Sequence, residues 1–324
     1  MADASTHPPP FPPVAEAGRS SRPPARPWSG EGAWRNSSRL VRLYRLARTR
    51  NPVTFNDKVR YKMLRDRSAL MVRFADKAAM REYVAAVVGE DHLPRALALL
   101  TSADELAGVQ LPREFVLKPT HGSGACVVVS DGAPGVARLP DPRWGWTYTL
   151  VRPEHAPTAA LVDIAAGWLD KRYGRGPNHE WAYGLARRQL LVEELLRDPS
   201  GDLPVDVKLF VFHGHCRFVQ VDAGRFGART QDFFDSSWRP LAMTGGHPVS
   251  VPPPVRPDRL EQMVQLAETL ARETDFVRVD LYHLPDRVLV GELTSSPAGG
   301  DSPFHPPWWN AEFGASWTVP RRYR

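Results

Sequence analysis

Cysteine is scarce in this 324-residue chain, and long apolar runs are absent. The two cysteines, Cys126 and Cys216, lie in apolar segments and form no CxxC pair. We therefore expect buried thiols in a reducing compartment, without a disulfide framework or a thiol-based metal site. No segment approaches the roughly 18 apolar residues that a membrane span needs, and the N-terminus lacks the charged-then-apolar order of a signal peptide. These absences predict a cytoplasmic protein.

Several catalytic signatures are also missing. No GxxxxGK[ST] segment occurs, which excludes a P-loop nucleotide site. No D-x-D occurs, which disfavours the metal-dependent glycosyltransferases that rely on such a pair. No Ser–His or Cys–His arrangement indicates a side-chain nucleophile. His213 and His215 flank Gly214 in an expected hairpin turn, where the remaining ligands of a zinc site are missing.

Proline and positive charge are unevenly distributed along the chain. The 32 prolines gather near the start and around 248–257, and we expect residues 1–35 to form a disordered tail. Between residues 36 and 67, ten Arg or Lys stand against two Asp. This basic segment lacks the interleaved aromatic residues of single-strand binders, so we expect no nucleic-acid partner.

The basic segment begins with a predicted helix within residues 38–50. Leu40, Leu43, Tyr44 and Ala47 form one stripe, and arginines occupy most of the remaining arc. Two interpretations are open. The helix either packs on the protein body, or it makes a peripheral contact with anionic lipid.

From Phe115 onward the pattern changes from helices to mostly hairpin-linked strands with further helices between them. This mixture favours an α+β (α/β) fold with two lobes over a single doubly wound sheet. The predicted division is a tail at 1–35, a helical region at 36–110, a first lobe at 111–192 and a second lobe at 193–324.

The segment FVLKPTHGSG places a lysine at the end of an apolar strand. Burying Lys118 is costly unless an anion meets it. Gly122 and Gly124, around Ser123, would let backbone N–H groups approach phosphate oxygens. A lysine that reaches solvent from an edge strand, followed by an ordinary glycine turn, explains the same residues. Alone, the segment leaves both interpretations open.

A second apolar strand ends in Glu193 and Glu194 and continues to Leu196, where backbone groups could meet a flat heterocycle. Asp206 and Lys208 are two residues apart in the next strand and therefore share one face. The carboxylate could bind ribose hydroxyls, and the ammonium could bind phosphate. A solvated strand face with a weak ion pair is the alternative.

The segment VRVDLYHLPDRVLVGEL predicts a hairpin whose turn is centred on Asp286. This register places Asp280 opposite Glu292 and Tyr282 opposite Val290. Directly opposed side chains stand about 4.5–5.5 Å apart at Cβ, where like charges are destabilising. Two carboxylates in this position would share a cation, or one of them would have a raised pKa.

Arg278 and Thr294 form the next predicted pair on the same face. Mg²⁺ takes carboxylate oxygens together with substrate phosphates, so Asp280 and Glu292 are candidate metal ligands. The alternative is a solvent-exposed strand face on which Arg278 neutralises the two carboxylates.

Taken together, these segments resemble the ATP-grasp superfamily, and more narrowly its TupA-like subgroup, which is named for teichuronopeptide biosynthesis. The resemblance runs from about Asn51 to Trp317. It implies two α+β lobes that hold ATP between them. The segments that carry it are TFNDKVRYKM, ADKAAMREYV, FVLKPTHGSG, HEWAYGLARRQLLVEELL, DVKLFVFHG and VRVDLYHLPDRVLVGELTSSPAGG.

The resemblance assigns roles in nucleotide binding. Two lysines would bind phosphate, the glycine loop would close over the β- and γ-phosphates, and Glu193 and the backbone of Leu196 would meet adenine. Asp206 would bind the ribose, whereas Lys208 would reach phosphate. The implied nucleotide-binding residues are Lys77, Lys118, Gly122, Ser123, Gly124, Glu193, Glu194, Leu196, Asp206 and Lys208.

The resemblance also assigns the chemistry of the hairpin. Asp280 and Glu292 would hold Mg²⁺, and Thr294 stands where many ATP-grasp enzymes carry an asparagine ligand. Arg278 would face the transferred phosphoryl group and stabilise its developing charge. Lys118 and Arg278 are therefore the expected catalytic residues.

The activity that the resemblance implies is a carboxylate–amine ligase that uses ATP and Mg²⁺ and forms an acyl phosphate. The subgroup name suggests a cell-envelope polysaccharide or peptide-polymer precursor as substrate, together with an amine. Arg225, with Arg229 as second choice, is the candidate for binding the carboxylate, and a solvated arginine is the alternative. The alternatives are an ATP-grasp kinase, a glycosyltransferase-like enzyme of envelope-polymer synthesis and, less favoured, a basic binding scaffold.

Overall fold

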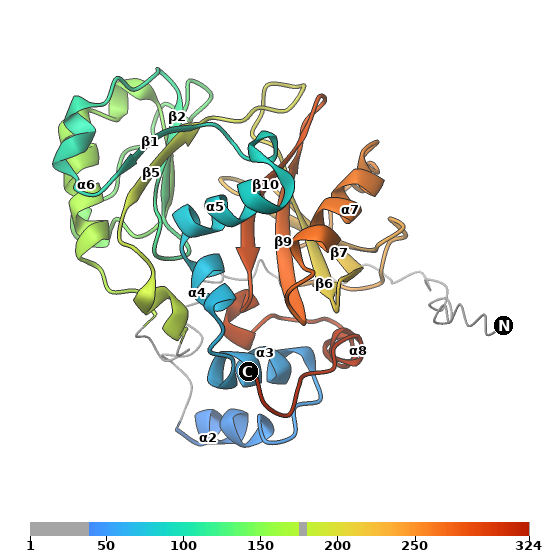
Figure 1. The fold of residues 1–324 in the computed structure, drawn as a ribbon. Coiled ribbons are helices and arrows are strands. Elements are labelled where there is room, and N and C mark those ends of the chain that lie inside the picture. Colours follow the sequence, from blue (N-terminus) through green and yellow to red (C-terminus); the bar gives the residue numbers. More distant parts are fainter. Residues whose placement is uncertain (1–38, 175–179, 324) are drawn as a thin grey trace.

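The computed structural model describes residues 39–174 and 180–323, and the tail expected at 1–35 lies outside them. Two five-stranded sheets stand side by side, with helices around them (Figure 1). Across sheet A the strands are β1 (Ala96–Leu100), β5 (Leu190–Glu194), β2 (Phe115–Pro119), β3 (Cys126–Val129) and β4 (Tyr148–Val151). Across sheet B they are β10 (Val288–Thr294), β9 (Phe276–His283), β6 (Asp206–Phe212), β7 (His215–Ala223) and β8 (Thr230–Asp235).

Neighbouring strands are antiparallel except β3 and β4, which are parallel. The helices are α2 (Arg39–Arg48), α3 (Phe55–Arg65), α4 (Ala69–Ala75), α5 (Lys77–Val88), α6 (Thr158–Asp170), α7 (Leu260–Leu270) and α8 (Trp309–Ala315). Short 3₁₀ segments include η5 (Trp181–Leu185) and η6 (Pro297–Gly300). This arrangement agrees with the predicted α+β fold of two lobes.

Two strands of sheet A differ from the predicted division of the chain. Strand β1 falls inside the region 36–110 that was expected to be helical, and it forms the edge of sheet A beside β5. Strand β5 belongs to sheet A and runs to Glu194, beyond the expected boundary at 192. The sequence of β1, ALALL, gives no alternation that separates a strand from a helix. The division into lobes remains a prediction.

Sheet B has one uniformly apolar face and one divided face. On the apolar face, Val207 and Leu209 pack with residues of α5 and α7. On the other face, strand β6 presents Lys208 near its start and Phe210 and Phe212 toward its end, because alternate residues of a strand share a face. The functional site therefore begins where this aromatic packing ends.

Helices α3 and α8 cover the aromatic half of the divided face. The ring of Phe55 in α3 makes edge-to-face contacts with Phe210, Phe276 and Phe313, at centroid distances of 5.9, 5.2 and 5.8 Å. Such pairs add to the free energy gained from burying apolar area. The packing leaves the polar half of the same face open toward sheet A.

A buried lysine joins α3 to the C-terminal part of the chain. The Nζ atom of Lys62 lies 2.6 Å from a carboxylate oxygen of Asp66 and 2.6 Å from one of Asp275. Asp275 also accepts hydrogen bonds from the indole of Trp317 at 2.8 Å and the hydroxyl of Tyr323 at 2.7 Å. Because Lys62 is 2% exposed, its charge depends on these partners rather than on water.

We expect Lys62→Met to lower the free energy of unfolding by about 3–5 kcal/mol, because Asp66 and Asp275 would lose their buried cation. Chemical denaturation followed by tryptophan fluorescence measures this loss. Arg143→Met is the matched control, since it removes a cation from the exposed pair with Asp141 and should have a much smaller effect. Similar losses in the two variants would contradict the anchoring role.

Helix α2 forms as predicted, but its apolar stripe does not pack on the body. Leu40 and Leu43 are exposed, and so are Tyr44 and Ala47. The helix is attached through Arg48, which donates two hydrogen bonds to one carboxylate oxygen of Asp57. Within the described residues, no helix combines the length and the apolar character that crossing a bilayer requires.

Candidate active site

One cavity of about 620 Å³ lies between the two sheets and is lined from both of them. Its size falls within the range of small-molecule and cofactor sites, about 300–1,000 Å³. The predicted site residues that line it are Lys77, Lys118, Ser123, Gly124, Glu193, Glu194, Leu196, Asp206, Arg225, Asp280 and Glu292. The fold thus brings residues from six separate segments of the sequence to one place, while their binding roles remain predictions.

Lys77 occupies the first turn of α5 and reaches the glycine loop. Asp76 caps the helix by accepting from the backbone N–H of Ala78 at 2.9 Å. The Nζ of Lys77 donates to the carbonyl oxygen of Gly122 at 2.5 Å. Burial lowers the pKa of Lys77, and the nearby carboxylate of Glu292 only partly offsets this effect. A lysine in this position gains most when a further anion enters the cavity.

An aromatic side chain missed by the sequence reasoning supports the glycine loop. The indole of Trp146 donates to the carbonyl oxygen of Ser123 at 2.8 Å, and its ring stacks on Tyr173 at 5.4 Å. A Cβ atom on Gly122 would lie 2.4 Å from the Trp146 ring, so this position requires glycine. Gly124 has φ of +86°, which also favours glycine.

The side chain of Glu193 has two cationic partners inside the structure. It accepts a hydrogen bond from Arg81 at 2.8 Å, and it forms an ion pair with Lys118. Glu194 accepts from the backbone N–H of Arg95 at 2.8 Å. Glu193 therefore holds Lys118 at the cavity wall, a role that the sequence reasoning did not assign. Apolar and aromatic side chains also line the cavity: Val116, Val128, Tyr148, Leu150 and Tyr282.

The hairpin of β9 and β10 carries the predicted pair of carboxylates. Glu292 pairs with Asp280 in the ladder, as predicted. Tyr282 was expected opposite Val290, and this is wrong. A bulge at Gly291 shifts the register, so Val290 pairs with Leu281 and Tyr282 with Leu289. The physical reason is close packing, since a Cβ atom on Gly291 would lie 2.8 Å from the Tyr282 ring.

Arg278 pairs with Thr294 in the ladder, as predicted, and it also clamps Asp280. Its guanidinium donates to both carboxylate oxygens of Asp280, at 2.6 and 2.7 Å, and to the hydroxyl of Thr294 at 3.2 Å. Neither Thr294 nor Arg278 is among the residues that line the main cavity, so the expected role of Thr294 as a third metal ligand gains no geometric support. The hydroxyl instead helps to orient Arg278.

The two carboxylates have opposite pKa shifts. Burial raises the pKa of Asp280 above its ordinary value, although Arg278 and Lys208 oppose this. Burial also raises the pKa of Glu292, but the charges of Lys77, Arg278 and Lys208 outweigh it and leave the pKa below its ordinary value. Glu292 is therefore the carboxylate that most readily stays ionised for a metal.

The donor set of the hairpin fits a magnesium ion that is shared with a nucleotide. Among the described residues, no group of three His, Cys, Asp or Glu side chains is placed to hold a metal. Asp280 and Glu292 supply two carboxylates, and Mg²⁺ commonly uses one or two carboxylates plus substrate phosphates and water. The pair therefore fits a metal that arrives with phosphate oxygens.

Lys208 is surrounded by three carboxylates on the polar half of sheet B. Its Nζ lies 3.3 Å from Asp222, 3.4 Å from Asp280 and 4.0 Å from Asp206. Burial lowers the pKa of Lys208, but these acids outweigh it and raise the pKa above its ordinary value. Asp222 was missed, because a single acid at the end of a strand gives no sequence signal. Lys208 acts as the common counter-ion of the cluster.

Arg225 connects the two lobes at the side of the cavity. It donates to Asp206 at 2.5 Å, and its guanidinium lies 4.8 Å from the ring centroid of Tyr148 in sheet A. Arg229, the second predicted carboxylate ligand, pairs with Asp222 at 3.0 Å. Both arginines thus have internal partners in this structure, and their contact with substrate stays a prediction.

We expect Asp222→Asn to lower the free energy of unfolding at neutral pH by about 2 kcal/mol, because Lys208 and Arg229 lose a charged partner. Burial raises the pKa of Asp222, but Lys208 and Arg229 outweigh it and bring the pKa below its ordinary value. The stabilisation is therefore complete above the unfolded-state pKa, near 3.9, and is lost as the pH falls below it. Denaturant titrations over a pH series should show the two proteins converging on acidification. Divergence would contradict the assigned charge.

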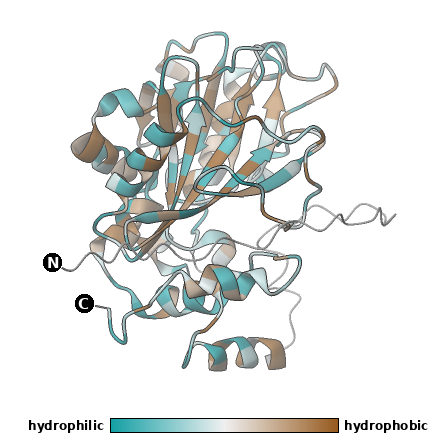
Figure 2. Ribbon diagram, turned by 90° about the vertical axis from the view of Figure 1, so that its right-hand side faces the viewer, coloured by the Kyte–Doolittle hydropathy of each residue, from teal (hydrophilic) through white to brown (hydrophobic). Residues whose placement is uncertain are grey.

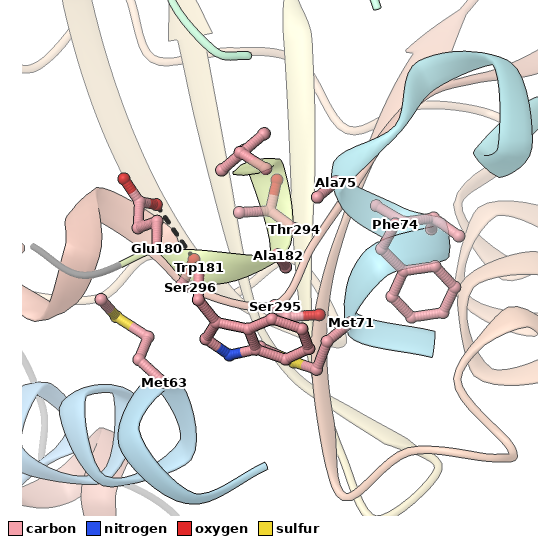
Figure 3. A pocket seen from close by; sticks show the side chains of 12 residues that line it. Met63, Met71, Phe74, Ala75, Glu180, Trp181, Ala182, Thr294, Ser295 and Ser296 are labelled. Carbon is pink, nitrogen blue, oxygen red and sulfur yellow. Dashed lines mark hydrogen bonds between the residues drawn. The ribbon is translucent and has the colours of Figure 1, made fainter. Parts of the chain in front are cut away.

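A small pocket lies beside Arg278 and Thr294, between η5, α4 and the end of β10 (Figure 3). It encloses about 20 Å³, room for roughly one water molecule. Trp181 lines it, and the Nε1 of this residue has no hydrogen-bond partner in the described structure. The hydroxyl of Ser296 donates to Glu180 at 3.1 Å at its rim. The sequence reasoning did not identify this pocket.

A family model described as TupA-like ATP-grasp matches residues 57–134 and 173–318. No curated protein matches the chain.

Solved structures with a similar fold include the ATP-grasp ligase PsnB complexed with a minimal precursor, with 10% identity, coverage of 71% of this chain and 54% of that chain, and a TM-score of 0.38. D-alanine–D-alanine ligase from Bacillus anthracis complexed with ATP has 12% identity, coverage of 69% and 55%, and a TM-score of 0.37. D-cycloserine synthetase DcsG has 13% identity, coverage of 76% of this chain and 70% of that chain, and a TM-score of 0.41. The chain thus spans about half the length of PsnB. Sequence identities and TM-scores this low support no functional argument.

The family match rests on the segments that build the cavity. Its two ranges contain Lys77, Lys118, Asp280 and Glu292, and they make up more than half of the chain. The family predicted from the motifs is confirmed: the chain belongs to the TupA-like ATP-grasp family.

Proposed function

We propose that this protein is an ATP- and Mg²⁺-dependent ligase that joins a carboxylate to an amine through an acyl phosphate. One observation carries the proposal. Lys118 and the glycine loop of sheet A face the Asp280–Glu292 pair of sheet B across a single cavity. Cations for phosphate on one wall and carboxylates for a metal on the other are the arrangement that phosphoryl transfer requires.

In this proposal, bound Mg²⁺–ATP supplies the phosphoryl group that activates the carboxylate, and the amine then displaces phosphate. Lys77 and Lys118 position the phosphates, with backbone N–H groups of the glycine loop. Arg278 neutralises charge on the transferred group. Asp280, whose carboxylate Arg278 holds in place, would bind the metal together with Glu292.

The substrates that we propose are a cell-envelope polysaccharide or peptide-polymer precursor that carries the carboxylate, and an amine co-substrate. The family name supports the envelope precursor. We also propose a cytoplasmic location, which the two buried free thiols support.

The test is ADP release by the full chain with a panel of amino acids, hexuronic acids and short peptides, each assayed with and without an amine. A ligase requires both substrates. If the carboxylate oxygens carry ¹⁸O, an acyl phosphate transfers one ¹⁸O to the released phosphate. ADP release that needs only a hydroxyl acceptor would show a kinase instead. Turnover without ¹⁸O transfer would contradict the acyl phosphate.

A further inference from the structure

Helix α2 presents a stripe of large apolar side chains that no other described part of the chain covers. Leu40 is 77% exposed, Leu43 62%, Tyr44 63% and Leu46 53%. The helix lies at the outer edge of the molecule in both ribbon views (Figures 1 and 2). Single exposed leucines are ordinary, whereas four large apolar side chains within two turns indicate an interaction surface.

The attachment of α2 to the body is ionic, so the apolar stripe is not needed to hold the helix in place. Arg45 pairs with Asp301 at 3.0 Å, and Arg48 pairs with Asp57 at 2.7 Å. These arginines therefore occupy the side of the helix that faces α3 and η6, and the leucines occupy the outward side. A helix with this division matches the pattern of helices that lie in a membrane interface.

Exposed positive charge gathers around α2. Arg50 lies two residues beyond the end of α2, and Arg65 ends α3. The exposed Arg321 and Arg322 belong to the C-terminal segment, which rests on α3 because the hydroxyl of Tyr61 donates to the carbonyl oxygen of Arg321 at 2.8 Å. Clustered basic side chains beside an apolar stripe are complementary to an anionic lipid surface.

We propose that α2 docks on an anionic phospholipid bilayer. Leu40, Leu43 and Tyr44 enter the boundary between headgroups and acyl chains, and the nearby arginines lie at the level of the phosphates. A nucleic acid would use the charge but would leave the leucines exposed. A second copy of this chain would cover the leucines but would bring two arginine clusters together, which is unfavourable.

Docking would also set the position of the active-site hairpin relative to the bilayer. Asp301 follows η6, the segment directly beyond β10, and it pairs with Arg45 of α2 and Arg60 of α3. The strand that carries Glu292 is therefore tied to the docking helix. This inference goes beyond the proposed ligase and does not depend on it.

The test is co-sedimentation of the full chain with vesicles of phosphatidylcholine alone and of an equal mixture with phosphatidylglycerol. We expect binding to the mixed vesicles that weakens with added salt. The Leu40→Glu/Leu43→Glu variant should reduce the partition coefficient at least ~tenfold, because it removes two buried leucines. Arg321→Glu/Arg322→Glu should reduce the preference for anionic vesicles by roughly fivefold per arginine.

The matched control is Val251→Glu/Val255→Glu. It makes the same change in charge at two other exposed apolar residues, which are 91% and 89% exposed, and it should leave binding unchanged. Unchanged thermal unfolding would show that the variants fold. Wild type that stays in the supernatant, equal binding to neutral vesicles, or equal loss in the control would each overturn the proposal. If light scattering shows that the wild type is a dimer and the Leu40→Glu/Leu43→Glu variant is a monomer, the proposal is overturned in favour of self-association.

Discussion

Replacing Glu292 with Gln, or Asp280 with Asn, is expected to reduce turnover by about 10³-fold or more while the protein stays folded. Each change keeps the size of the side chain and removes one of the two carboxylates available to the metal. Charge that develops on the transferred phosphoryl group would then lack its main counter-charge. The measurement is kcat for ADP release, together with the dependence of the rate on Mg²⁺ concentration.

Measurements of folding stability should show that these two variants lose turnover without misfolding. Asp280 has a raised pKa because it is buried, so a neutral Asn relieves part of an unfavourable charge. Asp232→Asn is the control, since Asp232 is a buried carboxylate of sheet B that holds Ser250 and does not line the cavity. It should retain turnover. Full activity in the Asp280→Asn/Glu292→Gln double variant would refute the metal assignment.

Lys118→Ala is expected to weaken ATP binding in the presence of Mg²⁺ by about 10- to 100-fold. Loss of one charge-assisted hydrogen bond to phosphate costs about 1.5–3 kcal/mol, and each 1.4 kcal/mol is a factor of ten in affinity. Isothermal titration calorimetry with and without Mg²⁺ measures the dissociation constant directly. Wild-type binding should itself depend on the metal.

Arg81→Ala provides the matched control for this experiment. Arg81 and Lys118 both pair with Glu193, but Arg81 does not line the cavity. If Lys118 binds phosphate, the Arg81 variant should bind ATP much more tightly than the Lys118 variant. Equal losses would mean that both residues act only by holding Glu193. A well-folded wild type that binds no ATP would exclude an ATP site in this cavity.

Local pattern was enough to place the hairpin of β9 and β10. Alternation of apolar and polar residues on either side of LPDR predicted that Asp280 faces Glu292 and Arg278 faces Thr294, and both pairs are present. The same reasoning failed for the pairs between Gly291 and the turn, where a bulge shifts the register. The bulge results from packing against the Tyr282 ring, which the pattern within the strand does not show. The register near the turn and the register at the Asp280–Glu292 pair therefore differ by one residue.

The partners of the charged residues could not be read from the chain. The side chain of Glu193 pairs with Arg81 and Lys118, which come from α5 and β2, and its expected contact with adenine remains a prediction. Asp222 was missed, although it lies 3.3 Å from Lys208. Such pairs depend on which strands become neighbours in a sheet, and strand order is a long-range property.

The sequence by itself determined the family, the two-lobed α+β class and most of the residues that line the large cavity, because these depend on short motifs and on side-chain alternation within single strands. Only the tertiary structure decided that Arg278 clamps Asp280, that Lys208 balances three acids, and that the leucines of α2 point outward. Those outcomes depend on burial and on charges brought together from distant segments. Neither is encoded in the local pattern of any one segment.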